Sequence, residues 1–162
     1  MQLLRTLRDL PPALRCGAVS IGNFDGVHLG HARIVEALRA VAAEVCGPAI
    51  VFTFDPHPVR LLRPDLAPPP FTWTDRKAEL LADIGVDAVI AYPTDEDLLQ
   101  LTPDDFFGRI ICEQLAARAM VEGPNFFFGR DRAGDIHKLR ALCDAHDVRL
   151  TIVDPTKYGS DG

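Results

Sequence analysis

Strand-like and helix-like segments alternate along the whole of this 162-residue chain. Short runs of small, β-branched or aromatic residues predict strands, and glycine, proline or aspartate ends most of them. The expected strands are residues 17–21, 49–54, 86–92, 119–122 and 149–153, and the expected helices are residues 29–45, 74–84, 103–118 and 136–146. Such alternation predicts an α/β fold with right-handed crossovers: a Rossmann-like parallel sheet with helices on both faces.

Length and composition fit one globular domain. Apolar residues make up 48% of the chain and charged residues 25%. A chain of this size buries enough surface to fold without a metal ion or disulfides. We therefore expect residues 1–162 to form a single domain, in which the proline-rich residues 61–71 are an exposed loop. The four cysteines include no C-x-x-C pair and are interpreted as reduced structural thiols.

Several classes of partner are disfavoured by the same features. No apolar run approaches the ~18 residues that a membrane-spanning helix requires, and the N-terminal segment lacks the apolar core of a secretory signal. The net charge of −6 argues against duplex nucleic acid as the main partner, because phosphate-backbone binding needs a basic face. We expect a cytoplasmic protein with neither a membrane nor a nucleic-acid partner. Single nucleotides are compatible with this charge, since backbone N–H groups at a helix N-terminus bind phosphate.

The first candidate site follows the first expected strand, where ligands of an open parallel sheet bind. Residues 22–31 read Gly-Asn-Phe-Asp-Gly-Val-His-Leu-Gly-His. His28 and His31 share one face at a helix start, beside unpaired N–H groups and the positive end of the helix dipole. Gly22 allows a tight turn, and Gly30 allows close approach of a ligand. The pattern indicates a phosphoryl site with two imidazole donors; the alternatives are two surface histidines or a metal site, which lacks a third ligand.

The second candidate site ends the next expected strand. Phe54 is followed by Pro56, His57 and Pro58. Each proline fixes its own φ and extends the residue before it. The segment therefore forms a rigid apolar lip that suits a planar ring system. The alternative is that the prolines merely end the strand.

The third candidate site is residues 121–135, after the fourth expected strand. Asn125 offers both a donor and an acceptor to a ligand. Phe128 and its neighbouring phenylalanines alternate in direction if the segment is extended, and some of them are alternatively core residues. Arg130 and Arg132 either supply positive charge beside phosphates or are solvated loop cations.

These motifs resemble those of the bacterial FAD synthetases, the FMN adenylyltransferase modules of bifunctional riboflavin kinase/FAD synthetases. Residues 28–31 are similar to the H-x-G-H signature of the nucleotidyltransferase superfamily, and the longer string over 22–31 resembles FAD synthetases specifically. Residues 54–58 resemble an F-x-P-H-P motif that borders the flavin. Residues 123–134 resemble a G-x-[ND]-F-x-F-G-x-x-x-x-G segment, and residues 77–87 resemble K-x-x-L-L-x-x-x-G-V-D. The resemblance therefore covers most of the chain.

The resemblance implies transfer of AMP from ATP to FMN, which gives FAD and pyrophosphate. Mg²⁺ is implied as a cofactor carried by ATP, with no dedicated protein ligand. The implied catalytic residues are His28 and His31; the nucleotide-binding residues are Gly22, Asn23, Gly30, Asn125 and Arg130; and the flavin-binding residues are Phe54, Pro56, His57, Pro58 and Phe128.

The sequence departs from the family pattern at its C-terminal end. Neither an I-S-S-T-x-I-R segment nor a riboflavin kinase barrel follows the last expected strand. We therefore expect no riboflavin kinase activity from these residues. Two other functions remain open. A related adenylyl- or cytidylyltransferase would bind no FMN, whereas a flavin- or nucleotide-binding module without catalysis would bind its ligand without turnover.

Overall fold

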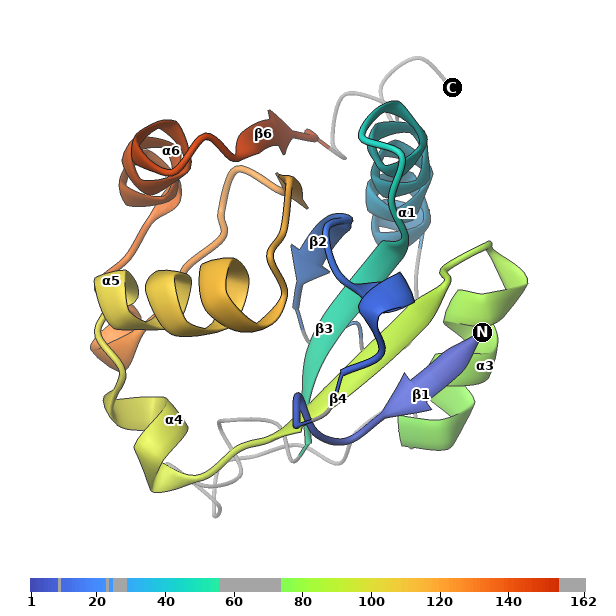
Figure 1. Ribbon diagram of the computed structural model, residues 1–162, viewed down its shortest axis with the longest axis horizontal. Helices are drawn as coiled ribbons and strands as arrows, with labels where there is room; N and C mark the ends of the chain where they lie inside the picture. The colour runs from blue at the N-terminus through green and yellow to red at the C-terminus, as the bar shows by residue number, and fades with distance from the viewer. Residues whose placement is uncertain (9, 23, 25–28, 56–73, 155–162) are drawn as a thin grey trace.

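Six parallel strands form one sheet in the computed structural model, which describes residues 1–8, 10–22, 24, 29–55 and 74–154. Their order across the sheet is β1-β4-β3-β2-β5-β6. The strands are β1 (Gln2–Leu4), β2 (Ala18–Ile21), β3 (Ala49–Asp55), β4 (Ala88–Pro93), β5 (Ala119–Glu122) and β6 (Arg149–Ile152), seen in Figure 1. The predicted parallel sheet is confirmed. Strand β1 is additional to the prediction and pairs with β4 at one edge.

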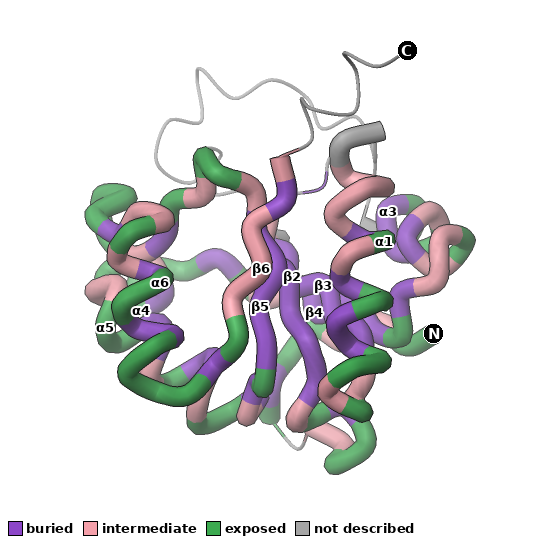
Figure 2. The backbone as a smooth tube through the Cα atoms, turned by 90° about the horizontal axis from the view of Figure 1, so that it is seen from above, coloured by how far each residue is buried: buried purple, intermediate pink, exposed green. Residues whose placement is uncertain are grey.

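Helices cover both faces of the sheet, as predicted. They are α1 (Leu29–Glu44), α3 (Thr74–Asp83), α4 (Glu96–Gln100), α5 (Pro103–Phe106), its π-helical continuation η2 (Phe107–Gln114) and α6 (Ile136–Ala145), with the 3₁₀ turns η1 (Pro12–Leu14) and η3 (Arg130–Arg132). Figure 2 shows α1 and α3 on one side of the buried strands, and α4, α5 and α6 on the other.

The two faces bury separate hydrophobic clusters. On β3, Ile50 and Phe52 join the cluster beneath α5, η2 and α6, whereas Val51 joins the cluster beneath α1 and α3. Successive side chains of a strand point to opposite faces, so both sets of β3 side chains are buried. This two-sided burial explains why the strands read as near-continuous apolar runs.

Two predicted boundaries differ from the structure by two residues or more, and a local hydrogen bond explains each. The helix expected over residues 103–118 ends at Gln114, because the Arg118 N–H donates to the Gly17 carbonyl (2.9 Å) and leads the chain into β5. The strand expected over residues 86–92 begins at Ala88, because the Val86 N–H still closes the preceding helix by donating to the Leu81 carbonyl (3.1 Å).

Candidate active site

The order of the strands reverses between β2 and β5. Strands β3, β4 and β1 lie to one side of β2, whereas β5 and β6 lie on the other. The β2–β5 ladder pairs only Ala18 with Ala119 and Val19 with Met120. The strands then part, and such a reversal opens a crevice at the carboxyl ends of the strands.

The turn after β2 and the first turn of α1 meet at this crevice. The Gly22 N–H donates to the Phe52 carbonyl of β3 (3.0 Å), which fixes the end of β2. Phe24 follows with a φ of 54° and is buried. Its ring centroid lies 4.9 Å from that of His31. A Cβ on Gly22 would lie 3.0 Å from the Phe24 ring, so glycine lets this ring pack closely. The predicted strand before this motif and the predicted helix after it are confirmed as β2 and α1.

A cavity of about 280 Å³ lies between the ends of β2 and β5. Three of the predicted site residues line it: Gly22, His31 and Asn125. Gly30 belongs to the first turn of α1, one residue before His31. The cavity therefore brings together parts of the first and third predicted sites, which are about a hundred residues apart in the sequence. The other lining residues are Ser20, Ile21, Phe24, Ile34, Glu122, Gly123, Pro124, Phe126 and Asp154.

Glu122 is a buried acid in this cavity that the sequence analysis did not single out. Its side chain is only 2% exposed. Its Oε1 accepts hydrogen bonds from the Ser20 hydroxyl (2.8 Å) and from the Ile21 N–H (2.8 Å). Its Oε2 has no hydrogen-bond partner among the described residues. Burial raises the pKa of the Glu122 carboxyl well above its ordinary value, and the two hydrogen bonds to Oε1 oppose this rise only in part.

The position of the Glu122 carboxyl explains how β2 ends. In a regular ladder the Ile21 N–H would donate to a main-chain carbonyl of β5. Here the Glu122 side chain accepts that hydrogen bond instead, beyond the last paired residues. The carboxyl therefore satisfies a buried N–H that would otherwise be unpaired where the strands part.

The raised pKa of Glu122 leads to a testable pH dependence of stability. The folded protein keeps the Glu122 proton above the unfolded pKa of about 4.3, whereas the unfolded chain loses it. Stability therefore falls as pH rises above that value, by up to about 1.4 kcal/mol per pH unit, until the folded pKa is reached. Glu122→Gln cannot titrate. We expect urea unfolding to show that wild type loses stability relative to Glu122→Gln as pH rises above about 5.

The comparison with Glu122→Gln isolates the Glu122 carboxyl from its titratable neighbours. His31 from α1 and Asp154 after β6 line the same cavity. Cys143 of α6 is also coupled to the Glu122 charge, and burial raises the pKa of its thiol to about 12. His31, Asp154 and Cys143 are present in both wild type and Glu122→Gln. A stability difference that does not vary with pH would contradict the raised pKa of Glu122.

A chain of aromatic contacts connects the second and third predicted sites. Phe52 contacts Phe54, with ring centroids 5.6 Å apart, and Phe106 of α5, with centroids 6.3 Å apart. Phe106 in turn contacts Phe128 (6.2 Å), and Phe128 stacks on Phe126 (5.5 Å). Phe54 and Phe128 thus lie at different points of one aromatic cluster.

The position of Phe128 is that of a core residue. Its side chain is buried, and its N–H and carbonyl pair with Gly134 across a short antiparallel bridge. A Cβ on Gly134 would lie 2.7 Å from the Phe128 ring, so this glycine is required by the packing. Phe54, by contrast, is only partly buried at the end of β3.

The two arginines of the third predicted site differ in their surroundings. Arg130 is exposed, and its N–H donates to the Leu101 carbonyl (2.7 Å). The Arg132 guanidinium lies 4.5 Å from the centre of the Phe127 ring, a cation–π contact. Neither arginine lines the cavity between β2 and β5.

Five predicted site residues lie outside the described part of the chain. They are Asn23, His28, Pro56, His57 and Pro58, and the expected loop over residues 61–71 lies outside it as well. Within the described ranges, no group of three or more His, Cys, Asp or Glu side chains could hold a metal ion. The four cysteines are free; Cys143 is buried, whereas Cys46 is exposed and is not a core residue as expected. No helix among the described residues is long and apolar enough to cross a membrane.

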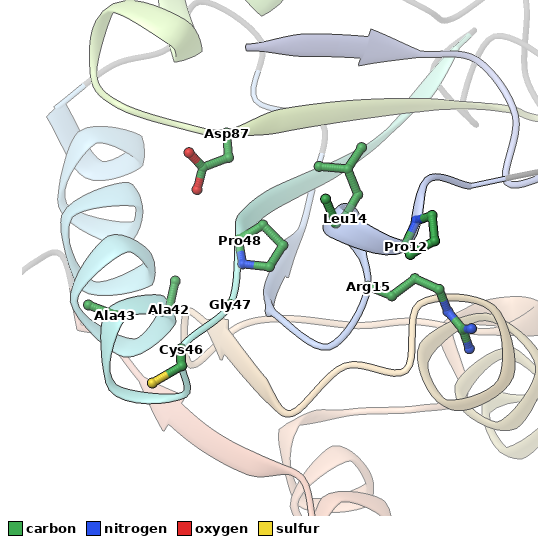
Figure 3. Close-up of a pocket in the computed structure, with 10 residues that line it drawn as sticks. Pro12, Leu14, Arg15, Ala42, Ala43, Cys46, Gly47, Pro48 and Asp87 are labelled. Carbon is green, nitrogen blue, oxygen red and sulfur yellow. The ribbon is translucent and has the colours of Figure 1, made fainter.

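A larger hollow of about 620 Å³ lies at the opposite ends of the strands, near the starts of β3 and β4. Figure 3 shows it between η1, the end of α1 and the starts of β3 and β4. Its two charged side chains already bind the protein: Asp87 Oδ2 accepts from the Ala49 N–H (2.8 Å), and Arg15 donates to the Glu113 carbonyl (3.1 Å). We therefore take the smaller cavity as the candidate site, because it lies at the strand ends where ligands of this fold bind.

Comparison with known proteins identifies relatives of this chain. The model of the FAD synthetase family matches residues 11–162. A bifunctional riboflavin kinase/FMN adenylyltransferase from Pseudomonas fluorescens is 37% identical over 86% of this chain and 45% of its own length. The protein of that name from Escherichia coli K12 is 35% identical over 83% of this chain and 44% of its own length. The chain thus spans about half the length of the curated relatives it matches.

One solved structure has a fold similar to that of this chain. A crystal structure named as macrolide-efflux protein from Streptococcus pneumoniae superposes with a TM-score of 0.77, with 23% identity, over 94% of this chain and 49% of its own. At this identity the likeness concerns the fold alone.

Proposed function

The chain belongs to the FAD synthetase family, and from this premise we propose that it is an FMN adenylyltransferase that uses ATP. An oxygen of the FMN phosphate attacks the α-phosphorus of ATP in line, and pyrophosphate leaves to give FAD. The observation that carries the proposal is the meeting of Gly22, His31 and the first turn of α1 at the crevice where the strand order reverses.

The start of α1 is the proposed binding site for the ATP phosphates. The first N–H groups of a helix have no intrahelical acceptor, and the helix dipole adds positive potential there. His31 lies in the first turn and lines the cavity. We assign to His31, together with His28, the donation of hydrogen bonds to phosphoryl oxygens that gain charge in the transition state. Positioning and charge stabilisation then suffice, without a covalent intermediate.

The remaining nucleotide contacts are proposed from the sequence motifs and from the cavity. Gly22 and Asn125 line the cavity, which supports their assignment to the nucleotide. Gly30 would let the ligand approach the backbone of α1 closely. Asn23 and Arg130 are assigned by the motif alone.

The proposed flavin site borders the carboxyl end of β3. Phe54 is the last residue but one of β3 and is partly buried. Pro56, His57 and Pro58 follow the strand in the sequence. Phe128 is buried against Phe106 and Phe126. Its proposed contribution is therefore to support the aromatic cluster that includes Phe54 from within the core.

Mg²⁺ belongs to this proposal as an ion carried by the ATP phosphates. Hard cations bind phosphate oxygens and often keep several water ligands, so the chain needs no dedicated metal site. When bound, the ion would neutralise charge on the phosphates. We name no protein ligand for it.

The extent of the module is also a proposal. All six strands belong to one sheet, which supports the interpretation of residues 1–162 as a single adenylyltransferase domain. Riboflavin kinase activity is not expected from these residues. In the longer relatives a second domain would supply it. We place the reaction in the cytoplasm, where ATP is available.

The direct test is chromatography of flavins after incubation of the protein with FMN, ATP and Mg²⁺. We expect FAD to form from FMN and ATP. No product is expected when CTP replaces ATP or when riboflavin replaces FMN, because the proposed reaction needs adenylate and a flavin phosphate. Absence of FAD combined with tight FMN binding would indicate a binding module without turnover. Absence of both would contradict the flavin assignment.

A further inference from the structure

The free oxygen of Glu122 marks an incomplete hydrogen-bond site in the cavity between β2 and β5. A buried polar atom without a partner costs free energy. Glu122 Oε2 is such an atom among the described residues, and Glu122 lines the cavity together with His31 and Asn125. Because Oε1 is already held by Ser20 and Ile21, the carboxyl is fixed in place, and the structure itself offers Oε2 no partner.

The carboxyl presents Oε2 as a donor. The Glu122 side chain is buried, and burial favours the neutral form of a carboxylic acid. A neutral carboxyl accepts at one oxygen and donates from the other. Oε1 is the acceptor here, so Oε2 carries the proton and requires an acceptor atom from a ligand.

The charges around the cavity indicate which part of a nucleotide lies near Glu122. His31 comes from the first turn of α1, whose positive end suits a polyphosphate. Asp154 also lines the cavity, and it follows Val153, whose N–H donates to the Glu122 carbonyl (2.9 Å). An acidic side chain disfavours a polyanion next to it. The nucleoside, which is neutral and rich in acceptor nitrogens and oxygens, therefore suits the part of the cavity formed by Glu122 better than the phosphates do.

We propose that Glu122 is a nucleotide-binding residue whose Oε2 donates a hydrogen bond to the nucleoside part of ATP. This inference rests on the proposed function, because it assumes that ATP occupies the cavity. It adds a contact that no motif of the sequence indicated. It also gives Glu122 two roles, since the same carboxyl holds the end of β2 through the Ile21 N–H.

The test compares dissociation constants of ATP and FMN for wild type, Glu122→Met and Glu122→Gln. Methionine has a similar length but no donor, so we expect ATP binding to weaken roughly three- to tenfold, the net effect of one neutral hydrogen bond. Glutamine keeps a carbonyl acceptor and an N–H donor, and ATP binding should weaken less than about twofold. FMN binding should change little in either variant. Tripolyphosphate lacks the nucleoside, and its binding should also change little.

Val19→Ala is a matched control for lost stability. Val19 is buried in β2 beside Ser20, and it does not line the cavity. This variant removes packing without removing a polar group near the ligand. If Glu122→Met and Val19→Ala weaken ATP and FMN in the same proportion, Glu122 has only a structural role and the inference is wrong.

A pH series keeps the inference testable if Glu122→Met fails to fold. Ionisation of Glu122 removes the Oε2 donor, so the ATP affinity of wild type should fall at high pH more steeply than that of Glu122→Gln. His31, Asp154 and Cys143 are present in both proteins, which differ only in the side chain at position 122. Parallel pH profiles would overturn the inference. Failure of wild type to bind ATP at any pH would contradict both the proposed function and this inference. Unchanged ATP binding in Glu122→Met would contradict the Glu122 contact alone.

Discussion

Replacing His31 with alanine should lower the turnover number for FAD formation by roughly 10²–10³-fold, with little change in the affinity for FMN. His31 lines the cavity at the first turn of α1, and the buried Phe24 ring packs against its imidazole. A donor held in this way is already placed when charge develops on the phosphoryl oxygens. Its loss should therefore raise the barrier of the chemical step. Steady-state kinetics and FMN titration on the same preparations measure the two quantities separately.

His137→Ala is the matched control for this experiment. His137 also lies in the first turn of a helix, α6, and its side chain is exposed. It does not line the cavity, so we expect its replacement to leave turnover unchanged. If His31→Ala weakened FMN binding as much as it lowered turnover, the transition-state role of His31 would be wrong. His28→Ala is expected to behave like His31→Ala, on the basis of the sequence motif.

Replacing Phe52 with alanine should have the largest effect on stability. The Phe52 ring is completely buried and contacts Tyr92, with ring centroids 5.4 Å apart, as well as Phe54 and Phe106. Removing a buried phenylalanine leaves a cavity and costs about 3–5 kcal/mol. This is a large part of the ~5–15 kcal/mol that stabilises a typical domain. Urea unfolding followed by circular dichroism measures the loss.

Phe127→Ala provides the comparison, because it makes the same substitution at the surface. Phe127 is 43% exposed, and its described ring contact is the one with Arg132. We expect its replacement to cost less than about 1 kcal/mol. Equal losses in the two variants would show that Phe52 does not anchor the cluster between β3 and α5.

The sequence predicted the longer elements well because their patterns are local. In α1 the side chains of Leu38 and Val41 recur at helical spacing and are buried, and Gly47 and Pro48 follow its end. The helix expected from residue 103 begins there, with the Thr102 hydroxyl accepting from the Asp105 N–H (3.1 Å). Such periodicity and capping can be recognised without knowledge of the tertiary structure.

The elements that the sequence did not reveal are too short to show a periodic pattern. Strand β1 has only three residues and exists because it pairs with β4 at the sheet edge. Helix α4 has five residues, begun by the Asp95 cap on the Leu98 N–H. Segments this short show no repeat of a hydrophobic pattern, so propensity alone does not assign them.

The candidate site was predicted only in part, because some of its residues meet through contacts between distant segments of the chain. Gly22, His31 and Asn125 were recognised from motifs, and the cavity brings them together. Glu122 gave no comparable signal, because an acid at the end of an apolar run usually faces solvent. Its burial depends on Ser20 and Ile21, about a hundred residues earlier in the chain. Phe128 was assigned to the flavin, but the residues that bury it, among them Phe106 and Gly134, were not evident from the motif.

The short ladder between β2 and β5 also bears on the order in which the protein folds. Ile21 and Glu122 are 101 residues apart, so joining their strands closes a long loop at a cost in chain entropy that only two residue pairs offset directly. Strands β3 and β4 are closer in sequence and share six pairs. We therefore expect the β2–β5 seam to form late in folding. Because the candidate site spans this seam, a partly folded chain lacks the cavity. If ATP binds there as proposed, its binding reports on the last step of assembly.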